Sequence, residues 1–289
     1  MTDSRAARSP IWLWQGSGAT FAVHDGRSGR AAPDPGGVCT NEGADGFVAL
    51  AAARTPGAVA ALSFFRPDGG AVAECGDGMR CVAAALDPTG TAGMLRFDTP
   101  AGLRTARVLS VRDGRARVRV SMGKPRFRPA PADPRAFADL TPDNRPTGDS
   151  ARPGLASFGP PILVDLGEPH AVFLIDEPPS PDLCRTVGRA LQRHPFFQET
   201  AGVNVSFAFV HRPDAILLRV DERGGEETAA GGGGACAAVA AAIAVRRCVR
   251  RVTVSTPGGE LFVDWPAAAE MQLIGPAEPL CRTGAEKKR

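Results

Sequence analysis

Residues 74–81 read Glu74-Cys75-Gly76-Asp77-Gly78-Met79-Arg80-Cys81, a glycine-rich turn that leads into a run of small residues typical of a helix. Residues 230–238 have the same character, with glycines at 231–234 followed by alanines and a cysteine. A glycine-rich turn before a helix allows a ligand to approach the unpaired N–H groups of the helix N-terminus. The sequence therefore predicts two such N-termini, one in each half of the chain.

The surroundings of the two turns also repeat. A pair of glycines ends residues 67–70 and residues 222–225, ahead of each turn, and a Thr-Pro turn follows at residues 99–102 and 256–259. The offsets are 155, 156 and 157 residues, so three landmarks repeat in register. Such a repeat predicts two similar structural halves. The halves differ at one position that matters for chemistry, because Cys75 of the first turn corresponds to Gly231 of the second.

Length and composition indicate a globular protein with room for two cores. The chain has 289 residues, of which 43% are hydrophobic and 22% charged. Its net charge of +3 comes without a basic block, which argues against nucleic acid as a partner. Residues 235–245 are too few to cross a bilayer, and residues 1–10 lack the apolar core of a secretory signal. We expect a cytoplasmic protein with a small-molecule substrate and no membrane partner, and we keep a homodimer as an open alternative.

Cysteine and lysine usage bears on cofactors. The seven cysteines are an odd number, and the spacing of Cys75 and Cys81 does not match zinc ligands, so we expect free thiols and no metal. Of the three lysines, Lys124 precedes a proline and Lys287 and Lys288 lie in the C-terminal tail. None of them suits a Schiff base with pyridoxal phosphate. The sequence predicts no cofactor.

Short apolar segments bounded by glycine and proline predict an α+β protein with two sheets, each wrapped around one principal helix. The predicted strands are residues 11–14, 21–23, 58–65, 95–97, 106–111, 116–121, 162–166, 171–175, 203–210, 215–220, 252–255 and 260–265. The predicted helices are residues 46–53, 79–86, 182–194 and 234–246, and the last, apolar on all sides, should be buried. Residues 126–161, rich in Pro, Asp and Arg, predict a linker between halves at residues 1–125 and 162–266.

The two helix starts indicate anion binding and proton transfer. A helix N-terminus carries unpaired N–H groups and partial positive charge, so two of them facing one cleft would hold a carboxylate. The same environment favours a thiolate at Cys75, which can remove a proton from the carbon next to that carboxylate. Cofactor-free racemases use a base on each face of the carbon, and Gly231 supplies none. Among the histidines, His170 before a strand is a candidate, whereas His24 is expected in a loop or at the surface.

The ordered motifs resemble those of the diaminopimelate epimerase family over nearly the whole chain. Residues 75–81 look like CGNGxRC, and residues 231–236 look like CGTGAC. Further matches are residues 16–21 to GxGNDF, 43–46 to GADG, 64–69 to FxNxDG, 168–170 to NPH, 204–207 to NVxF and 222–228 to ERGxGET. The resemblance implies a cofactor-independent enzyme with two pseudo-symmetric domains, each a curved, mainly antiparallel sheet around a central helix. It also implies a closing strand, within residues 267–289, that returns to the first domain.

The resemblance also implies site residues. Cys75 is expected to be catalytic, and we expect Cys75 and Gly231 to face each other across the ligand cleft. The expected substrate-binding residues are Gly76, Asp77, Gly78, Arg66, Glu168, His170, Asn204, Glu222, Arg223, Gly231, Gly232 and Gly233.

Several positions depart from the family pattern. The second catalytic cysteine falls at Gly231, and three family asparagines fall at Ala19, Arg66 and Glu168. Arg66 and Glu168 can pair with each other or bind the substrate separately, and we favour binding. Asp77 replaces the CGNG asparagine and adds a negative charge beside the expected anion site, unless Arg66 or Arg80 compensates for it.

Three functions remain open. We expect an isomerase or epimerase of a small amino-acid-like or carboxylate substrate, with Cys75 as base, other than ordinary diaminopimelate epimerase and in a specialised biosynthetic pathway. Water, the substrate, or a displaced acid such as Glu226 or Glu227 would serve the opposite face. The alternatives are a double-bond isomerase or a cyclase or pericyclase on the same fold, or a non-catalytic descendant that binds a small molecule.

Overall fold

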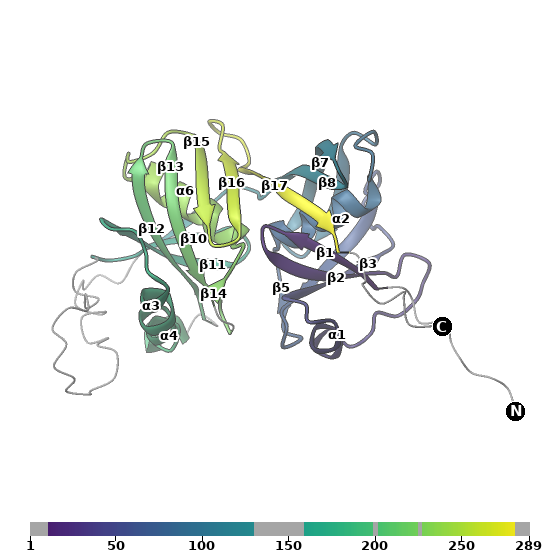
Figure 1. Cartoon of the computed structure of the whole chain (residues 1–289), viewed down its shortest axis with the longest axis horizontal. Coiled ribbons are helices and arrows are strands. Elements are labelled where there is room, and N and C mark those ends of the chain that lie inside the picture. Colours follow the sequence, from purple (N-terminus) through teal and green to yellow (C-terminus); the bar gives the residue numbers. More distant parts are fainter. Residues whose placement is uncertain (1–10, 130–158, 199–201, 225–226, 281–289) are drawn as a thin grey trace, which may run out of the picture. The chain divides into compact units, whose positions relative to one another are not determined.

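The computed structural model describes residues 11–129, 159–198, 202–224 and 227–280. The chain divides into two compact units. Unit 1 comprises Met1–Val120 and Gly275–Arg289, and unit 2 comprises Ser121–Ile274. Each unit combines many strands with a few helices (Figure 1). The structure thereby confirms the predicted α+β class.

Unit 1 is a sheet wrapped around one helix. Its strands are β1 (Ile11–Gly16), β2 (Ala19–Asp25), β3 (Gly46–Ala51), β4 (Ala60–Phe65), β5 (Ala71–Val72), β6 (Leu95–Thr99), β7 (Gly102–Arg112) and β8 (Arg115–Ser121). The pairs β1–β2, β3–β4, β6–β7 and β7–β8 are antiparallel, and the pairs β2–β3 and β4–β6 are parallel. Strand β17 (Gln272–Pro279) pairs with both β8 and β1, so the sheet closes on itself.

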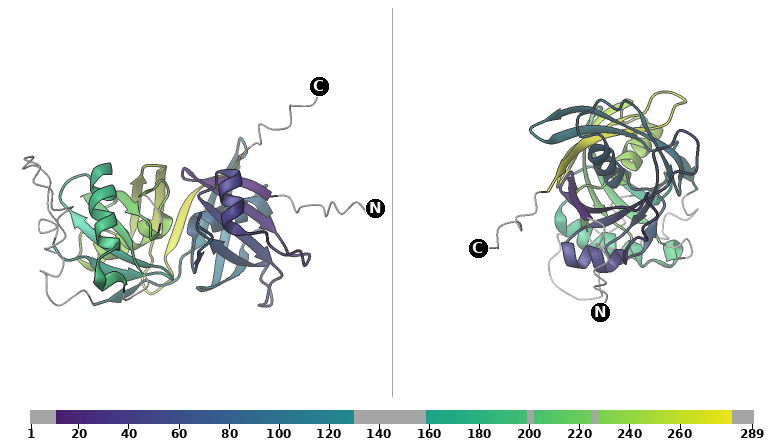
Figure 2. Two further views of the ribbon diagram at one scale, coloured as in Figure 1. Left: turned by 90° about the horizontal axis from the view of Figure 1, so that it is seen from below. Right: turned by 90° about the vertical axis from the view of Figure 1, so that its right-hand side faces the viewer.

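Helix α2 (Gly76–Leu86) lies inside this closed sheet. It contacts β1, β2, β3 and β7, and its residues from Gly76 to Ala84 are all buried. The right-hand view of Figure 2 shows the strands of unit 1 arranged around it. A second helix, α1 (Pro35–Glu42), lies outside, where Cys39 joins Ala22 and Phe47 in a separate hydrophobic cluster. The start of α2 is therefore held by packing on several strands.

Unit 2 repeats the same order of strand pairings. Its strands are β9 (Arg126–Arg128), β10 (Ile162–Asp165), β11 (Pro169–Ile175), β12 (Asn204–Arg212), β13 (Ala215–Asp221), β14 (Glu227–Thr228), β15 (Arg251–Thr256), β16 (Gly259–Asp264) and the first residues of β17. The pairs β11–β12 and β13–β15 are parallel, and the pairs β10–β11, β12–β13, β15–β16 and β16–β17 are antiparallel. This sequence of relations matches unit 1 strand for strand and confirms two pseudo-symmetric halves.

Helix α6 (Gly232–Ala244) takes the place in unit 2 that α2 has in unit 1. Its residues from Ala235 to Ala242 are fully buried, which confirms the prediction for a helix that is apolar on all sides. On the other face of the sheet, Phe173, Phe207 and Leu191 form a second core with the helices of residues 181–198. Those helices are α3 (Pro181–Leu183), the π-helix η3 (Cys184–Gly188), α4 (Arg189–Gln192) and α5 (Pro195–Gln198).

Three local predictions were wrong. Residues 46–53 were predicted as a helix, but Gly46–Ala51 form strand β3. A short apolar run that is largely buried on both faces has no helical or strand periodicity. Helix α1 was missed although Asp34 caps it, Pro35 opens it and Gly43 closes it in the left-handed conformation. His24 was expected at the surface, but it lies on β2 with 1% of its area exposed.

The structure also shows where the predicted segments between and after the halves lie. Arg126–Arg128, the first part of the predicted linker, pairs with β10 as strand β9. Residues 130–158 of the predicted linker and residues 281–289 of the predicted return segment lie outside the described residues. Strand β17 begins in unit 2 and continues into unit 1 at Gly275.

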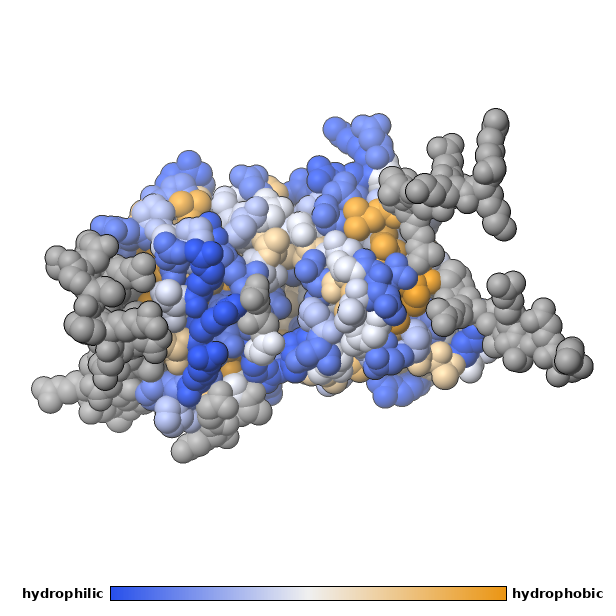
Figure 3. All heavy atoms as spheres, turned by 60° about the horizontal axis from the view of Figure 1, so that its bottom comes forward, coloured by the Kyte–Doolittle hydropathy of each residue, from blue (hydrophilic) through white to orange (hydrophobic). Residues whose placement is uncertain are grey.

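The face in Figure 3 is mainly hydrophilic, with apolar residues in separate patches. In the described part of the chain, every helix is too short or too polar to cross a membrane.

Candidate active site

Cys75 is the N-cap residue of α2 and presents its thiol to the first turn of that helix. Its backbone is extended, with φ −149° and ψ 93°, and Sγ accepts a hydrogen bond from the Gly78 backbone N–H at 3.4 Å. The residue is half-buried. A Cβ on Gly78 would lie 3.0 Å from Val48 Cγ2 and 3.3 Å from Cys75 Sγ, so glycine keeps this turn close to the thiol. The geometry suits a thiolate, because a backbone N–H and the helix N-terminus both stabilise negative charge on sulfur.

Asp77 does not leave an uncompensated charge at this helix start. Its Oδ1 lies 2.6 Å from Arg80 Nη2, and both side chains are buried. Arg80 also donates to Ser17 Oγ at 3.0 Å and to the Pro276 carbonyl at 3.3 Å. Arg80 therefore supplies the compensation that the sequence required for an anion to bind beside Asp77.

Arg66 and Glu168 each form an ion pair within their own unit. Arg66 Nε lies 3.5 Å from Asp68 Oδ1 in the turn after β4, and Glu168 Oε2 lies 2.6 Å from Arg223 Nη2. Each of the two residues therefore has an ion-pair partner in its own unit. The separate substrate-binding roles expected for Arg66 and Glu168 stay a prediction.

Burial raises the pKa of other cysteine thiols. The pKa rises to about 11 for Cys39 and Cys248 and to about 12 for Cys81, and it rises further for Cys184. Desolvation of the charged form is the largest cause in all four. These thiols stay protonated and unreactive near neutral pH.

Limited alkylation near neutral pH is therefore expected to modify Cys75 first. Iodoacetamide reacts with thiolate, and the helix start at Cys75 favours that form. Peptide mapping after addition of about one equivalent measures the distribution of label. Preferential labelling of Cys39 or Cys248, with Cys75 unmodified, would contradict a thiolate at Cys75.

The matching helix start in unit 2 has a different backbone. Gly231 is the N-cap residue of α6 and adopts the left-handed conformation, with φ 62° and ψ 42°. It provides no side-chain cap, and a Cβ there would lie 3.0 Å from Val220 Cγ2 and 3.2 Å from Thr228 Cγ2. Gly232 and Gly233 follow as the first helical residues, so backbone N–H groups are the polar groups of this turn.

Replacing Gly231 by cysteine is expected to destabilise unit 2 rather than to add a second base. The left-handed backbone costs a residue with a Cβ about 1–2 kcal/mol, and contact with Val220 and Thr228 adds to this cost. Gly43→Cys is the matched control, because Gly43 has φ 64° and ψ 38° and a Cβ added there would meet no described atom within 4 Å. Thermal unfolding should show a larger fall in Tm for Gly231→Cys, and equal falls would contradict the crowding.

A polar cluster borders the start of α6. His170 on β11 is the register partner of Asn204 on β12. Asn204 Oδ1 accepts from the Arg223 backbone N–H at 2.8 Å, and Asn204 Nδ2 donates to the Pro169 carbonyl at 3.3 Å. Through the ion pair of Arg223, this network also includes Glu168. Unit 2 thus brings together the predicted residues Glu168, His170, Asn204 and Arg223.

His170 faces the first turn of α6. A Cβ on Gly233 would lie 3.2 Å from His170 Nε2. The pKa of His170 is lowered to about 4, mainly by burial; Asp165 opposes this shift, and the positive charge of Arg223 contributes to it. The imidazole is therefore neutral at neutral pH. Its Nδ1 has no hydrogen-bond partner among the described residues, so the ring has hydrogen-bonding capacity left for a ligand.

Two predicted acids have other surroundings. Glu222 is half-buried, and its carbonyl accepts a hydrogen bond from Gln192 Nε2 at 2.8 Å. The carboxylate of Glu227, an expected acid for the opposite face, forms an ion pair with Arg219. Glu226 lies outside the described residues.

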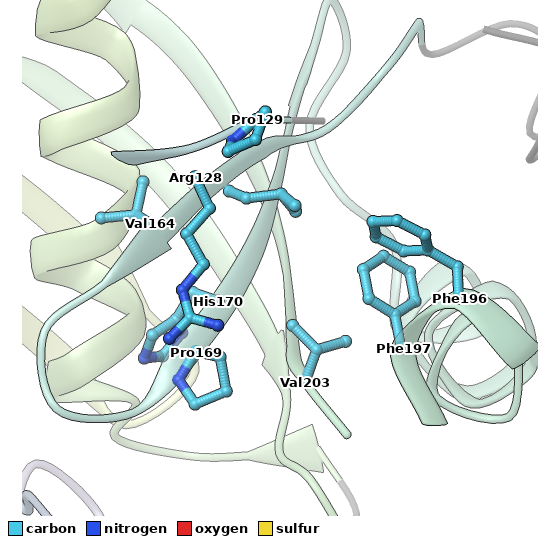
Figure 4. Close-up of a pocket in the computed structure, with 9 residues that line it drawn as sticks. Arg128, Pro129, Val164, Pro169, His170, Phe196, Phe197 and Val203 are labelled. Carbon is cyan, nitrogen blue, oxygen red and sulfur yellow. The ribbon is translucent and has the colours of Figure 1, made fainter. Parts of the chain in front are cut away.

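A cavity of about 220 Å³ in unit 2 borders Pro169 and His170. Figure 4 shows Arg128 extending toward these two residues, with Phe196 and Phe197 on the other side. Leucine, valine and phenylalanine side chains supply most of its lining. Arg128 Nη2 lies 2.5 Å from Asp165 Oδ2, so the one guanidinium among the lining residues is already compensated.

The ion pair formed by the residue before Cys75 was not predicted from the sequence. Arg104 Nε lies 2.6 Å from Glu74 Oε2, and both side chains are buried. A signal was present in β7, where Arg104 shares the inward face with Ala106 and Val108. An arginine at an inward strand position requires a buried acidic partner.

The predicted juxtaposition of Cys75 and Gly231 stays a prediction.

Comparisons with known proteins agree with the fold and with the motifs. The family model for diaminopimelate epimerase matches residues 162–278. The chain is 38% identical over 286 residues to the diaminopimelate epimerase of Xanthomonas axonopodis pv. citri, with 95% of each chain covered. It is 37% identical over 281 residues to the O-ureido-serine racemase of Streptomyces lavendulae, covering 93% of this chain and 92% of the racemase.

Solved structures share the fold at low sequence identity. A hydroxyproline epimerase from Agrobacterium vitis matches with a TM-score of 0.65 and 17% identity, over 94% of this chain and 90% of that chain. A methylitaconate-delta-isomerase matches with a TM-score of 0.52 and 14% identity, over 94% of each chain. Given its identity to curated relatives over almost its whole length, the chain belongs to the diaminopimelate epimerase family, whose curated members include epimerases and a racemase.

Proposed function

We propose that this enzyme inverts a carbon centre of a small amino-acid-like carboxylate, with Cys75 as the base that removes the proton. The observation that carries this proposal is the geometry of Cys75, whose Sγ caps the N-terminus of α2 through the Gly78 N–H. Of the other described cysteines, four have a raised pKa and Cys236 is fully buried, so among the described thiols Cys75 is the one best placed to ionise.

The proposed reaction transfers one proton at a time. The Cys75 thiolate takes the proton from the carbon next to the substrate carboxylate, so that the C–H bond breaks and an S–H bond forms. The backbone N–H groups of Gly76 and Asp77 stabilise the carboxylate as negative charge develops on it, while the Gly78 N–H donates to Cys75 Sγ. Water or an acid of the substrate gives a proton to the opposite face, because Gly231 has no ionisable group. The Cys75 thiol then releases its proton to solvent, which restores the thiolate and replaces the proton that was given.

The substrate-binding residues are proposed from both units. In unit 1 they are Arg66 and the residues of the glycine-rich turn at the start of α2. In unit 2 they are Glu168, His170, Asn204, Glu222, Arg223, Gly231, Gly232 and Gly233. The neutral imidazole of His170 and the network around Asn204 support this assignment.

We propose a substrate other than diaminopimelate. Three positions where the family has asparagine are Ala19, Arg66 and Glu168 here, so amide hydrogen bonds are replaced by a methyl group and two charges. A relative of 37% identity is an O-ureido-serine racemase, so the family's scaffold also accommodates an amino acid with a different side chain. A specialised biosynthetic pathway would use such a product. Exchanging a neutral hydrogen-bonding group for a charged one changes specificity strongly, because unmatched charge is costly to bury.

A substrate panel tests the proposal. Purified protein without added cofactor is incubated with LL-diaminopimelate, O-ureido-L-serine and trans-4-hydroxy-L-proline, and chiral chromatography measures inversion. We expect inversion of an amino acid with negligible turnover of LL-diaminopimelate. Ordinary turnover of LL-diaminopimelate would contradict the proposed change of substrate, and binding of a panel member without conversion would favour the non-catalytic alternative.

Because Cys75 is the one thiol of the two matching helix starts, a double-bond isomerase is a second candidate function. Such a reaction needs one base, which removes a proton from one carbon and returns it to another on the same face. Cys75 supplies that base, and Gly231 supplies no second one. Migration of a double bond in an unsaturated carboxylate, without inversion of any panel amino acid, would favour this candidate.

A further inference from the structure

The residue immediately before Cys75 carries a buried charge. The Glu74 side chain is 3% exposed, and its Oε2 lies 2.6 Å from Arg104 Nε, whose side chain is 9% exposed. Consecutive Cα atoms are about 3.8 Å apart, so the ion pair fixes the residue that leads directly into the Cys75 helix cap. An uncompensated carboxylate there would disfavour the thiolate.

Arg104 is well anchored for this role. It lies on β7, which packs against α2, and it faces inward with Ala106 and Val108. Its Nη1 also donates to the Leu103 carbonyl at 3.2 Å. Arg104 thus links the residue that precedes the helix cap to a strand of the closed sheet.

We propose that Arg104, acting through Glu74, is a positioning residue that fixes the Cys75 turn and keeps its thiol able to ionise. The inference rests on the proposed function in one respect, the use of Cys75 as base. Together with Asp77–Arg80, the pair makes every carboxylate next to the cap part of an ion pair. The α2 start then keeps the positive character of its backbone N–H groups.

Other charged or titratable side chains lie on α2 and on the strands that contact it. On α2 and on the strands packed against it they are Asp77, Arg80, Cys81, His24, Asp25, Arg104, Arg107 and Arg112. Arg107 and Arg112 are exposed, and Asp25 is paired with Arg27. Strands β1 and β3 carry no charged residue. The Glu74–Arg104 pair is therefore the charge pair that directly adjoins Cys75 in sequence.

The test measures the pKa of Cys75 in the full-length protein. The rate of iodoacetamide labelling of the Cys75 peptide is followed by mass spectrometry as a function of pH in Glu74→Gln, Arg104→Met and the double variant. Arg104→Met should raise the pKa of Cys75 by about 1, because the negative charge of Glu74 is then uncompensated and disfavours the thiolate. Glu74→Gln should lower the pKa of Cys75, because the positive charge of Arg104 is then uncompensated and favours the thiolate. The double variant should return close to the wild-type value.

The two single variants are expected to shift the pKa of Cys75 in opposite directions, which distinguishes this inference from a purely structural role. Shifts of both single variants in the same direction, or no shift in Glu74→Gln, would overturn it. Glu74→Gln keeps the size of the side chain, so the test stands even where Arg104→Met fails to fold. Arg115→Met is the control, because Arg115 forms an exposed pair with Glu278 and should leave the labelling profile unchanged. The labelling rate can be measured without turnover. If no panel substrate is inverted but the expected pKa shifts are seen, the proposed reaction is rejected and this inference stands.

Discussion

Replacing Cys75 by alanine is expected to lower the rate of substrate inversion by about 10²–10⁴-fold, the usual contribution of a positioned general base. The loss should fall mainly on kcat. The backbone N–H groups of the α2 turn remain to bind the carboxylate, and Gly78 keeps its place against Val48 and Phe21. Steady-state kinetics with the inverted panel substrate measure the effect.

Cys248→Ala is the matched control for that experiment. Cys248 is also half-buried, but it follows α6 and its pKa is raised to about 11 by burial. We expect its removal to leave kcat unchanged. Equal activities of Cys75→Ala and Cys248→Ala would show that the proton is moved by another group.

Arg80→Met is expected to destabilise unit 1 by about 3–5 kcal/mol, the usual effect of removing one partner of a buried ion pair. Arg80 is fully buried, and its loss would leave Asp77 without its cation and Ser17 Oγ without its donor. Denaturant unfolding followed by circular dichroism measures the change in the transition midpoint. Because Asp77 lies in the first turn of α2, this variant should also disturb the Cys75 cap.

Asp77→Asn in the Arg80→Met background should recover part of the stability, since the neutral amide needs no cation. Arg115→Met serves as the control, because its pair with Glu278 is exposed, and exposed pairs contribute about 0–1 kcal/mol. If Arg80→Met proved no more destabilising than Arg115→Met, the buried pair would not hold the α2 start. A double variant less stable than Arg80→Met would show that Asp77 has another partner.

The repeat around the two glycine-rich turns predicted two similar halves, and the family resemblance added the curved sheet around a central helix in each. Periodicity and breakers located most strands and both central helices, because helix starts with glycine and buried apolar runs leave clear local signals. The strand β3 carried no such signal, since both of its faces are buried. Helix α1 had its signals, in Asp34, Pro35 and Gly43, but its short polar sequence has little apolar periodicity.

Part of the candidate site depends on contacts that no local pattern shows. The Glu74–Arg104 pair joins a helix cap to a strand in β7, and sequence does not show which inward strand faces which cap. Gly231 is visible as a missing thiol, but the crowding by Val220 and Thr228 follows from the packing of β13 and β14. The compensation of Asp77 by Arg80 was predictable, because residues three apart on a helix are neighbours.

The most direct test of the central claim is inversion of the substrate in D₂O. Removal of a proton by Cys75 and reprotonation on the other face bring a solvent-derived deuteron to the inverted carbon. We predict that wild-type enzyme forms product with deuterium at that carbon, by NMR and mass spectrometry, and that Cys75→Ala forms neither product nor exchanged substrate at a comparable rate. Inverted product that keeps protium at that carbon, or full exchange by Cys75→Ala, would contradict the claim.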